Sequence, residues 1–161
     1  MQTERFETFV LLIDAIHKSI NKVKNEITAD CGVKSVHTMW LYELLIHPKG
    51  LTATELAAKS RIDRSLVSRE IRELERGGYI ASDSVSGKRS YNSRITLTDK
   101  GKILAKKISE SAYTVQQSVS KDISAEELRS FYTVLEKIHE NLKNEINAKG
   151  ADDKSKENEN E

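Results

Sequence analysis

The 161-residue chain has little of what stabilises secreted or membrane proteins. Its one cysteine, Cys31, cannot form an intrachain disulfide, which favours a reducing, cytoplasmic setting. No apolar run approaches the roughly 18 residues of a membrane span. The N-terminal stretch MQTERFETFVLLIDAIHKS contains acidic residues and lacks a small-residue cleavage site, which argues against a signal peptide. We therefore expect a cytoplasmic protein without membrane contact.

Motifs for catalysis and metal binding are also missing from the sequence. It has no phosphate-cradling glycine loop and no nucleophile elbow. Its four histidines and single cysteine show neither HxxxH nor CxxC spacing, which would place two zinc ligands side by side. We expect no enzyme activity, no metal and no cofactor.

The chain lacks a large net charge, because 26 basic and 25 acidic residues sum to +1. The charge is unevenly distributed. Residues 59–94 hold nine basic and five acidic residues, a net charge of +4, whereas residues 150–161 hold five acids and two lysines, a net charge of −3. A basic excess confined to one region indicates nucleic-acid contact, although a solvated basic surface would give the same count. Residues 149–161 are expected to form a disordered acidic tail.

Two long helices are predicted near the ends of the chain. Apolar residues recur at spacings of three and four over about residues 4–29, and again after a capping box formed by Ser124 and Glu127. These apolar stripes are longer than a small central module can cover. We therefore expect residues 1–30 and 99–148 to form a helical dimerisation layer between two chains. The alternative is that the two stripes bury each other within one chain.

The residues between these ends, 33–98, are predicted to form a separate lobe that begins with a short helix. Ser35 is the expected N-cap of this helix, which ends at Ile46 before Pro48. Its inward side chains are predicted to be Met39, Trp40, Leu44 and Leu45.

Two closely spaced helices follow, in the arrangement of a helix-turn-helix. Thr52 is the predicted N-cap of the first, with Glu55 completing a capping box. The second begins after Asp63 and ends at Gly77-Gly78, where one glycine is expected to adopt a positive φ. The predicted inward stripe of the second helix is Val67, Ile71 and Leu74.

A β-hairpin is predicted directly after the helix-turn-helix. YIASD and YNSRITL have the composition of short strands, and the polar link SVSGKRS joins them. Thr98 then caps a helix over about residues 99–120. The expected fold is mainly α with a small β-hairpin wing: a winged helix-turn-helix lobe flanked by N- and C-terminal dimerisation helices.

The exposed residues of the second helix and of the wing are the candidates for contact with double-stranded DNA. Arginine can hydrogen-bond guanine bidentately in the major groove, and an arginine at a hairpin tip suits the minor groove. In one alternative the helix arginines pair instead with Glu70, Glu73 and Glu75. In another the lobe only binds proteins, which would require an exposed apolar patch on this helix. The predicted contact residues are Arg64, Ser65, Ser68, Arg69, Arg72, Arg76, Lys88 and Arg89.

Three stretches, LTATELAAKSRIDRSLVSREIRELERGGYI, GKRS and ITLTDKG, resemble the MarR family of winged-helix transcriptional regulators. The resemblance implies a homodimer on a pseudo-palindromic operator, usually a repressor that a small ligand or an oxidant releases. It also implies that Ser65, Ser68 and Arg69 face bases or nearby phosphates and that Arg89 enters the minor groove. One departure is Gly87, since many relatives carry an acid two residues before the wing arginine.

The resemblance further implies a ligand cleft lined by the first, second and fifth helices. Such a surface can accept a small aromatic or anionic effector, although the same residues also suit an ordinary core. A redox switch at Cys31 is the alternative. Relatives that sense hydroperoxides place their cysteine near the start of the first helix, where this chain has none. The predicted cleft residues are His17, His37, Met39, Trp40 and Tyr113.

Overall fold

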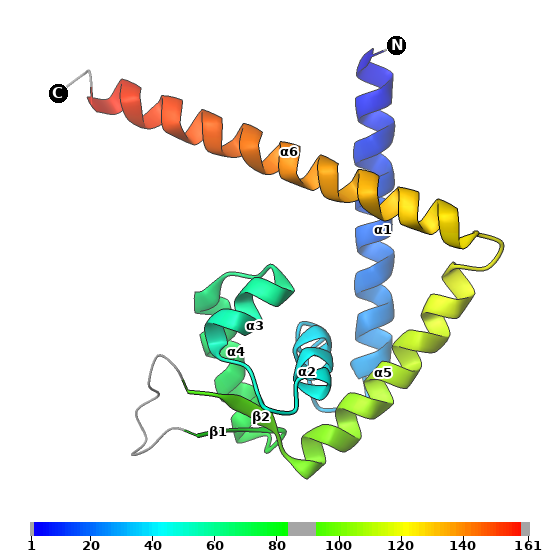
Figure 1. The fold of residues 1–161 in the computed structure, drawn as a ribbon, viewed down its shortest axis with the longest axis vertical. Helices are drawn as coiled ribbons and strands as arrows, with labels where there is room; N and C mark the ends of the chain where they lie inside the picture. Colours follow the sequence, from blue (N-terminus) through cyan, green and yellow to red (C-terminus); the bar gives the residue numbers. More distant parts are fainter. Residues whose placement is uncertain (1, 84–92, 159–161) are drawn as a thin grey trace. The chain divides into compact units, whose positions relative to one another are not determined.

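The computed structural model of the chain describes residues 2–83 and 93–158. Within them it contains helices and a pair of short strands (Figure 1). The chain divides into two compact units, Met1–Gln116 and Gln117–Glu161. The elements are α1 (Gln2–Thr28), α2 (His37–Ile46), α3 (Ala53–Ser60), α4 (Arg64–Arg76), β1 (Ile80–Ser82), β2 (Ile95–Leu97), α5 (Asp99–Val119) and α6 (Ala125–Asn158).

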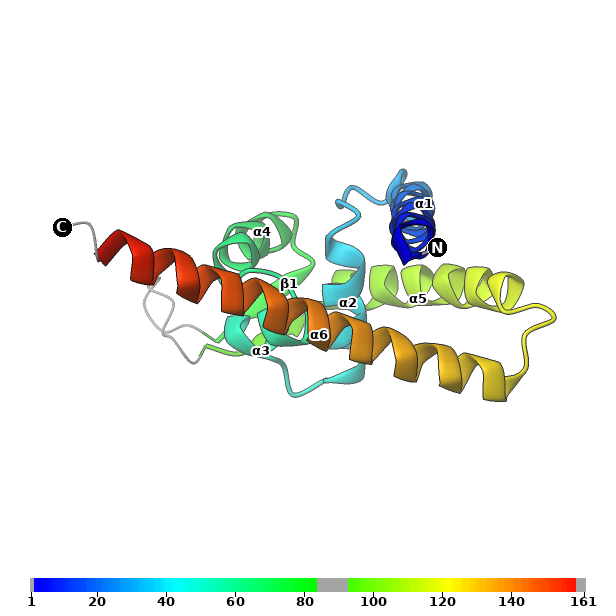
Figure 2. The same cartoon turned by 90° about the horizontal axis from the view of Figure 1, so that it is seen from above.

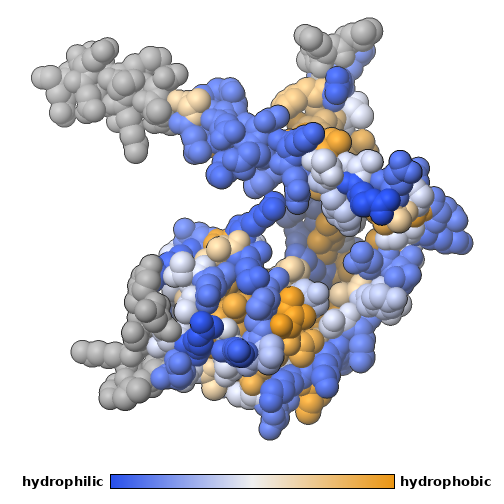
Figure 3. Space-filling view, viewed as in Figure 1, coloured by the Kyte–Doolittle hydropathy of each residue, from blue (hydrophilic) through white to orange (hydrophobic). Residues whose placement is uncertain are grey.

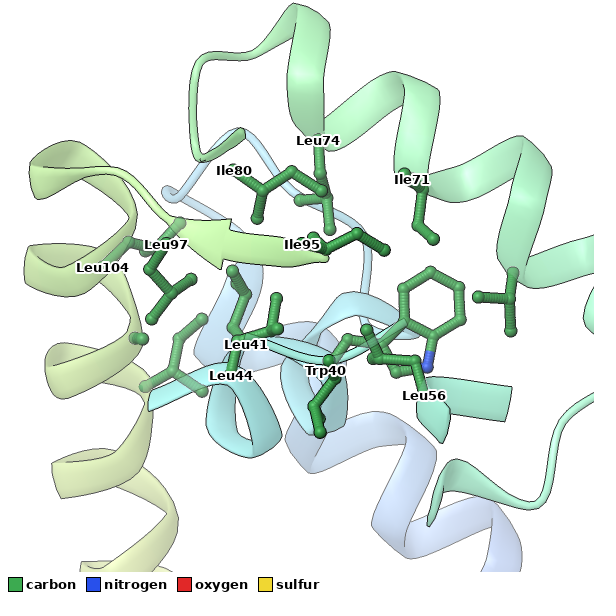
Figure 4. Packing of buried hydrophobic residues seen from close by; sticks show 14 of the residues in the cluster. Trp40, Leu41, Leu44, Leu56, Ile71, Leu74, Ile80, Ile95, Leu97 and Leu104 are labelled. Carbon is green, nitrogen blue, oxygen red and sulfur yellow. The ribbon is translucent and has the colours of Figure 1, made fainter. Parts of the chain in front are cut away.

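The apolar core lies in the first unit, where α2, α3 and α4 gather around the two strands and the start of α5 (Figures 1 and 2). Figure 4 shows apolar side chains from all these elements converging. The predicted inward stripe of α4 is confirmed, because Val67, Ile71 and Leu74 are almost completely buried. Each fully buried side chain of this size contributes roughly 1.5–3 kcal/mol to folding. This burial fixes which face of α4 points outward.

Helix α2 differs from the prediction in two respects. Its N-cap residue is Val36, whose backbone is α-helical and which makes no side-chain cap, so Ser35 is not the N-cap. A capping side chain needs an extended backbone, but here a turn leads into the helix. The inward face is also partly different: Trp40 and Leu44 are buried as predicted, but Met39 is 41% exposed and Leu41 is buried instead.

The helix-turn-helix forms as predicted. In the capping box of α3, the Glu55 N–H donates to Thr52 Oγ1 (3.2 Å) and the Thr52 N–H donates to Glu55 Oε2 (2.7 Å). Asp63 caps α4 by accepting from the Ser65 N–H (2.7 Å). Gly78, with φ +71°, supplies the predicted positive φ after α4.

The two strands are shorter than the expected hairpin. They pair antiparallel, with Ile80 opposite Leu97 and Ser82 opposite Ile95. A bridge also joins Leu51 to Ile95, through backbone bonds of 3.0 Å and 2.8 Å, and so ties the link before α3 to β2. The rest of the predicted hairpin lies outside the described residues.

Helix α5 begins at the predicted cap, since Thr98 Oγ1 accepts from the Gly101 N–H (3.0 Å) and donates to the Gly78 carbonyl (2.7 Å). Its first half buries Leu104 and Ile108 in the core. The described helices include none with the length and apolarity needed to cross a bilayer.

In the second unit, the predicted capping box at the start of α6 is present, with the Glu127 N–H donating to Ser124 Oγ (3.2 Å) and the Ser124 N–H donating to Glu127 Oε2 (2.8 Å). The helix continues to Asn158, into the stretch for which the sequence predicts disorder. A helix that has already nucleated gains one hydrogen bond for each residue it adds, which offsets the polar composition of this segment.

Candidate nucleic-acid interface

The outward face of α4 is polar and basic. It lies opposite the buried stripe, so its side chains project away from the lobe. No large apolar side chain of α4 is exposed, which is the opposite of what a protein-interaction module would need. Of the predicted contact residues on this helix, Ser68 is half-buried, and those that are exposed are Arg64, Ser65, Arg69, Arg72 and Arg76.

The serine nearest the N-terminus of α4 is part of its cap. Both the backbone N–H and the hydroxyl of Ser65 donate to Asp63 Oδ1. The Ser65 hydroxyl is the larger cause of a lowered pKa at Asp63, followed by the backbone N–H. With its proton committed to the cap, the Ser65 oxygen can act toward DNA only as an acceptor, for example from the amino group of cytosine or adenine.

The glutamate-pairing alternative concerns Arg69, Arg72 and Arg76, and within the described residues it holds for Arg69. Arg69 donates its Nε–H to Glu70 Oε1 (3.2 Å) while its side chain stays 65% exposed. Arg76 donates to the Arg72 carbonyl (3.3 Å), and the described part of the chain offers no carboxylate partner to either Arg72 or Arg76. These two arginines therefore keep their charge available to solvent or phosphates.

A buried ion-pair cluster that was not predicted from the sequence lies beneath Arg69. Glu70, only 2% exposed, accepts from Lys34 Nζ (3.0 Å), His37 Nε2 (3.1 Å) and Arg69 Nε (3.2 Å). Lys34 also pairs with Glu73 (2.6 Å). Burial pushes the pKa of Glu70 upward, but the bonds from Lys34, His37 and Arg69 outweigh it, so the pKa lies below its ordinary value. The sequence does carry a signal: Glu70 stands on the apolar stripe of α4, three residues from Val67.

The hydrogen bonds of His37 define its tautomer. The Lys34 backbone N–H donates to Nδ1 (3.2 Å), so Nε2 carries the proton and donates to Glu70. A charged imidazole would carry a second proton on Nδ1, so that two donors, Nδ1–H and the Lys34 N–H, would face each other. Burial accordingly lowers the pKa of His37, more strongly than the nearby Glu70 raises it. His37 is therefore a neutral, internally bonded histidine.

His37, Glu70 and Glu73 offer ligand atoms within 4.8 Å of one another, but their bonding does not suit a metal ion. Coordination through Nε2 would require the proton to move to Nδ1, which already accepts a hydrogen bond. The ammonium of Lys34 also lies between the two carboxylates and compensates their charge. The cluster is an ion-pair network, and the absence of a metal site stays a prediction.

We expect the stability of the protein to depend on pH through His37. Because the folded pKa is lowered, the unfolded chain binds more protons from about pH 6.5 down to that lowered value. This contribution to the free energy of unfolding is complete above about pH 6.5 and is lost as the pH falls through the folded pKa. Urea unfolding between about pH 7.5 and 5.5 should show the loss, and His37→Gln should reduce it. The matched control is His17→Gln, because His17 is exposed. If the loss of stability at low pH disappears in His17→Gln but persists in His37→Gln, the assignment of this loss to His37 is wrong.

Comparison with known proteins agrees with this geometry. Residues 32–90 match the family model described as the MarR family. The chain is 26% identical to an uncharacterized HTH-type transcriptional regulator, YdgJ, of Bacillus subtilis (strain 168). The alignment is 130 residues long and covers 79% of this chain and 77% of the relative. The resemblance of this part of the chain to the MarR family of transcriptional regulators is therefore confirmed.

Solved structures of MarR regulators share the fold. Staphylococcus aureus MepR in a DNA-binding conformation gives a TM-score of 0.73 at 21% identity, covering 83% of this chain and 98% of that one. A putative MarR family transcriptional regulator from Listeria monocytogenes, complexed with 26mer DNA, gives a TM-score of 0.71 at 21% identity. The match covers 83% of this chain and 87% of that one. These likenesses confirm the predicted mainly helical fold with a winged helix-turn-helix.

The residues predicted to line a MarR-type effector cleft are not gathered at one cavity. Trp40 is fully buried and His37 is 2% exposed, so both belong to the interior of the lobe. Met39, Tyr113 and His17 are exposed, and His17 Nε2 lies 2.9 Å from Asn21 Nδ2. A cavity of about 320 Å³ does lie between the end of α1, the link to α2 and the end of α4. His37 is the one predicted cleft residue among its lining, which is Thr28, Ala29, Gly32, Val33, Lys34, His37, Glu73, Leu74 and Tyr79.

The remaining predicted MarR features are Cys31 and the wing tip. Cys31 is half-buried; its thiol donates to the Ile27 carbonyl (3.4 Å), and its own carbonyl accepts from the Tyr79 hydroxyl (3.0 Å). Its environment is that of a structural residue, and the redox alternative gains no support. Lys88 and Arg89 lie outside the described residues, so their contacts stay predictions.

Proposed function

We propose that this protein binds double-stranded DNA sequence-specifically as a homodimer and represses transcription until a small aromatic or anionic effector releases it. One observation carries the proposal: α4 buries one face in the core and presents an exposed face of arginine and serine. A helix of this kind, held firmly by its apolar side, can enter a major groove without strain on the lobe. MepR and the Listeria regulator, whose structures are described with DNA or in a DNA-binding conformation, share this fold.

The roles of the α4 side chains follow from their partners. Arg72 and Arg76, without carboxylate partners in the described chain, are suited to phosphates, which fix the position of a protein on the duplex. Arg69, Ser65 and Ser68, nearer the N-terminus of the helix, are suited to base edges. We assign Lys88 and Arg89 to the minor groove as a continuation of the same proposal.

The proposed homodimer is supported by apolar side chains that reach the surface in both units. Apolar residues run along α1 in Figure 3, and α6 exposes a comparable set. Patches of this extent on a single chain mark association surfaces, and a second copy is the partner that closes them symmetrically. The exposed large apolar residues are Phe6, Val10, Leu11, Leu12, Ile16 and Ile20 on α1 and Phe131, Tyr132, Val134, Leu142 and Ile146 on α6.

The proposal is tested by selecting bound duplexes from a random pool with the full chain. We expect the selected duplexes to carry two inverted half-sites about one helical turn apart, as a two-fold symmetric dimer requires. Affinity for a selected duplex should fall about a thousandfold from roughly 50 to 200 mM salt, because basic side chains release counterions from the phosphates. Selection of no sequence, or binding that is insensitive to salt, would overturn the proposal, and a single unpaired half-site would overturn the dimer.

Whether a compound acts as the effector is a separate measurement on the same duplex. A small aromatic acid such as benzoate, added at increasing concentration, should weaken binding while the fold, followed by circular dichroism, is unchanged. Exposed Met39 and Tyr113 are the side chains through which we propose that it acts, because Trp40 is fully buried and both ring nitrogens of His37 already have hydrogen-bond partners.

A further inference from the structure

The exposed arginine best placed for base reading is attached to the buried cluster beneath it. We propose that Glu70 is a positioning residue that determines sequence specificity: it fixes the guanidinium of Arg69 for base recognition and takes its own position from Lys34 and His37. This inference rests on the proposed function. It adds a residue that does not contact DNA to those that select the sequence.

The geometry of the guanidinium explains what Glu70 would achieve. A guanidinium is planar, so the Nε–H bond to Glu70 Oε1 (3.2 Å) limits the rotation of the whole group. The four N–H groups on Nη1 and Nη2 remain for another partner. Two of them form the end-on fork that matches O6 and N7 of guanine. Because the Arg69 side chain is 65% exposed, this fork is accessible from outside the lobe.

Glu70 itself is held from several directions. Its side chain is 3% exposed, and its second carboxylate oxygen, Oε2, accepts from Lys34 Nζ (3.0 Å) and His37 Nε2 (3.1 Å). Lys34 lies in the link after α1, and His37 is the first residue of α2. The acceptor for Arg69 is therefore fixed by elements other than its own helix, which distinguishes this bond from an ordinary surface ion pair.

The contact also differs from the pairs that usually form on helices. Neighbours at i and i+1 diverge around a helix, so Glu73, at i+4, would be the usual partner of Arg69. Glu73 pairs with Lys34 instead (2.6 Å). The two carboxylates share the same lysine but only Glu70 contacts Arg69, which provides a matched pair for experiment.

The test compares the sequence preference of four proteins by selection from the same random pool: the natural chain, Arg69→Ala, Glu70→Gln and Glu73→Gln. Glutamine offers one acceptor oxygen to three donors, so Arg69 loses its anchor. We expect Glu70→Gln to relax preference at the base pair affected by Arg69→Ala, by about tenfold, the size of one charge-assisted hydrogen bond. Glu73→Gln should keep the natural preference. In the Arg69→Ala background, Glu70→Gln should cause no further relaxation.

The outcomes separate this inference from the proposed function. If Arg69→Ala leaves preference unchanged, the base contact assigned to Arg69 is wrong. If Arg69→Ala relaxes preference while folded Glu70→Gln keeps it, or if Glu73→Gln relaxes it equally, the positioning role of Glu70 is overturned. Should Glu70→Gln fail to fold, Lys34→Met serves in its place. It removes one donor to Glu70 at a half-exposed position and should relax preference at the same base pair, by less, whereas an unchanged preference would contradict the role.

Discussion

Replacing Gly101 by alanine is expected to destabilise the protein by about 3 kcal/mol, although alanine usually stabilises a helix relative to glycine by about 1 kcal/mol. A Cβ at this position would lie 1.8 Å from the carbonyl oxygen of Tyr79. That oxygen belongs to the backbone and accepts from the Thr98 N–H (3.1 Å), so it cannot move aside as a flexible side chain could. Either α5 or the chain that enters β1 has to shift, and both carry core residues.

The matched control is Gly78→Ala. Gly78 has a positive φ (+71°) but no atom within 4 Å of its Cβ position, so only backbone strain of about 1–2 kcal/mol is expected. Urea unfolding followed by circular dichroism measures both variants. We expect Gly101→Ala to lose more stability than Gly78→Ala. If Gly101→Ala is as stable as the natural chain, the close packing of α5 on Tyr79 is incorrect.

Trp40→Ala should be the most damaging substitution in the core, with an expected loss of about 3–5 kcal/mol. Trp40 is fully buried, and its indole N–H donates to Ser60 Oγ (3.0 Å), which connects α2 to the end of α3. Truncation would leave a large cavity and remove the donor. The loss approaches the whole stability of a typical small domain, so much of the variant should be unfolded at 25 °C.

Its neighbour Met39 provides the control, because the sequence places both side chains inside while the structure leaves Met39 41% exposed. Met39→Ala should change the free energy of unfolding by less than about 1 kcal/mol. Unfolding is followed by circular dichroism, since Trp40 is the one tryptophan of the chain and its replacement removes the fluorescence signal. Equal losses in the two variants would show that the exposed position of Met39 is incorrect.

The parts of the fold that were predictable are those encoded by neighbouring residues. Four helix caps are local start signals, and each forms as expected. They are the Thr52–Glu55 capping box, Asp63, Thr98 and Ser124. The cap at Ser35 failed because the turn before α2 uses hydrogen bonds between Lys34 and His37 instead. Local sequence does not reveal which of two competing arrangements the rest of the chain selects.

The candidate site was predictable in outline but not in its internal bonding. The apolar stripe of α4 identifies its outward face, and hence Arg69, from the sequence alone. The pairing of Arg69 with a glutamate of its own helix was one of the alternatives that the sequence left open. The cluster behind Glu70 was not predictable, because Lys34 and His37 are more than 30 residues from Glu70 and meet it only after folding. For the same reason His37 and Trp40 resembled ligand residues in the sequence, whereas tertiary packing makes them interior ones.

The backbone bridge between Leu51 and Ile95 has a consequence for how an effector could act. Arg94 adds to this connection by donating from Nη1 to the Gly50 carbonyl (2.7 Å), so the start of the helix-turn-helix and the base of the wing share one set of bonds. A change in angle between the start of α3 and the wing base would break them. In the proposed complex, we therefore expect the helix-turn-helix and the wing base to move as one piece, so that an effector changes the distance between the two lobes of the dimer.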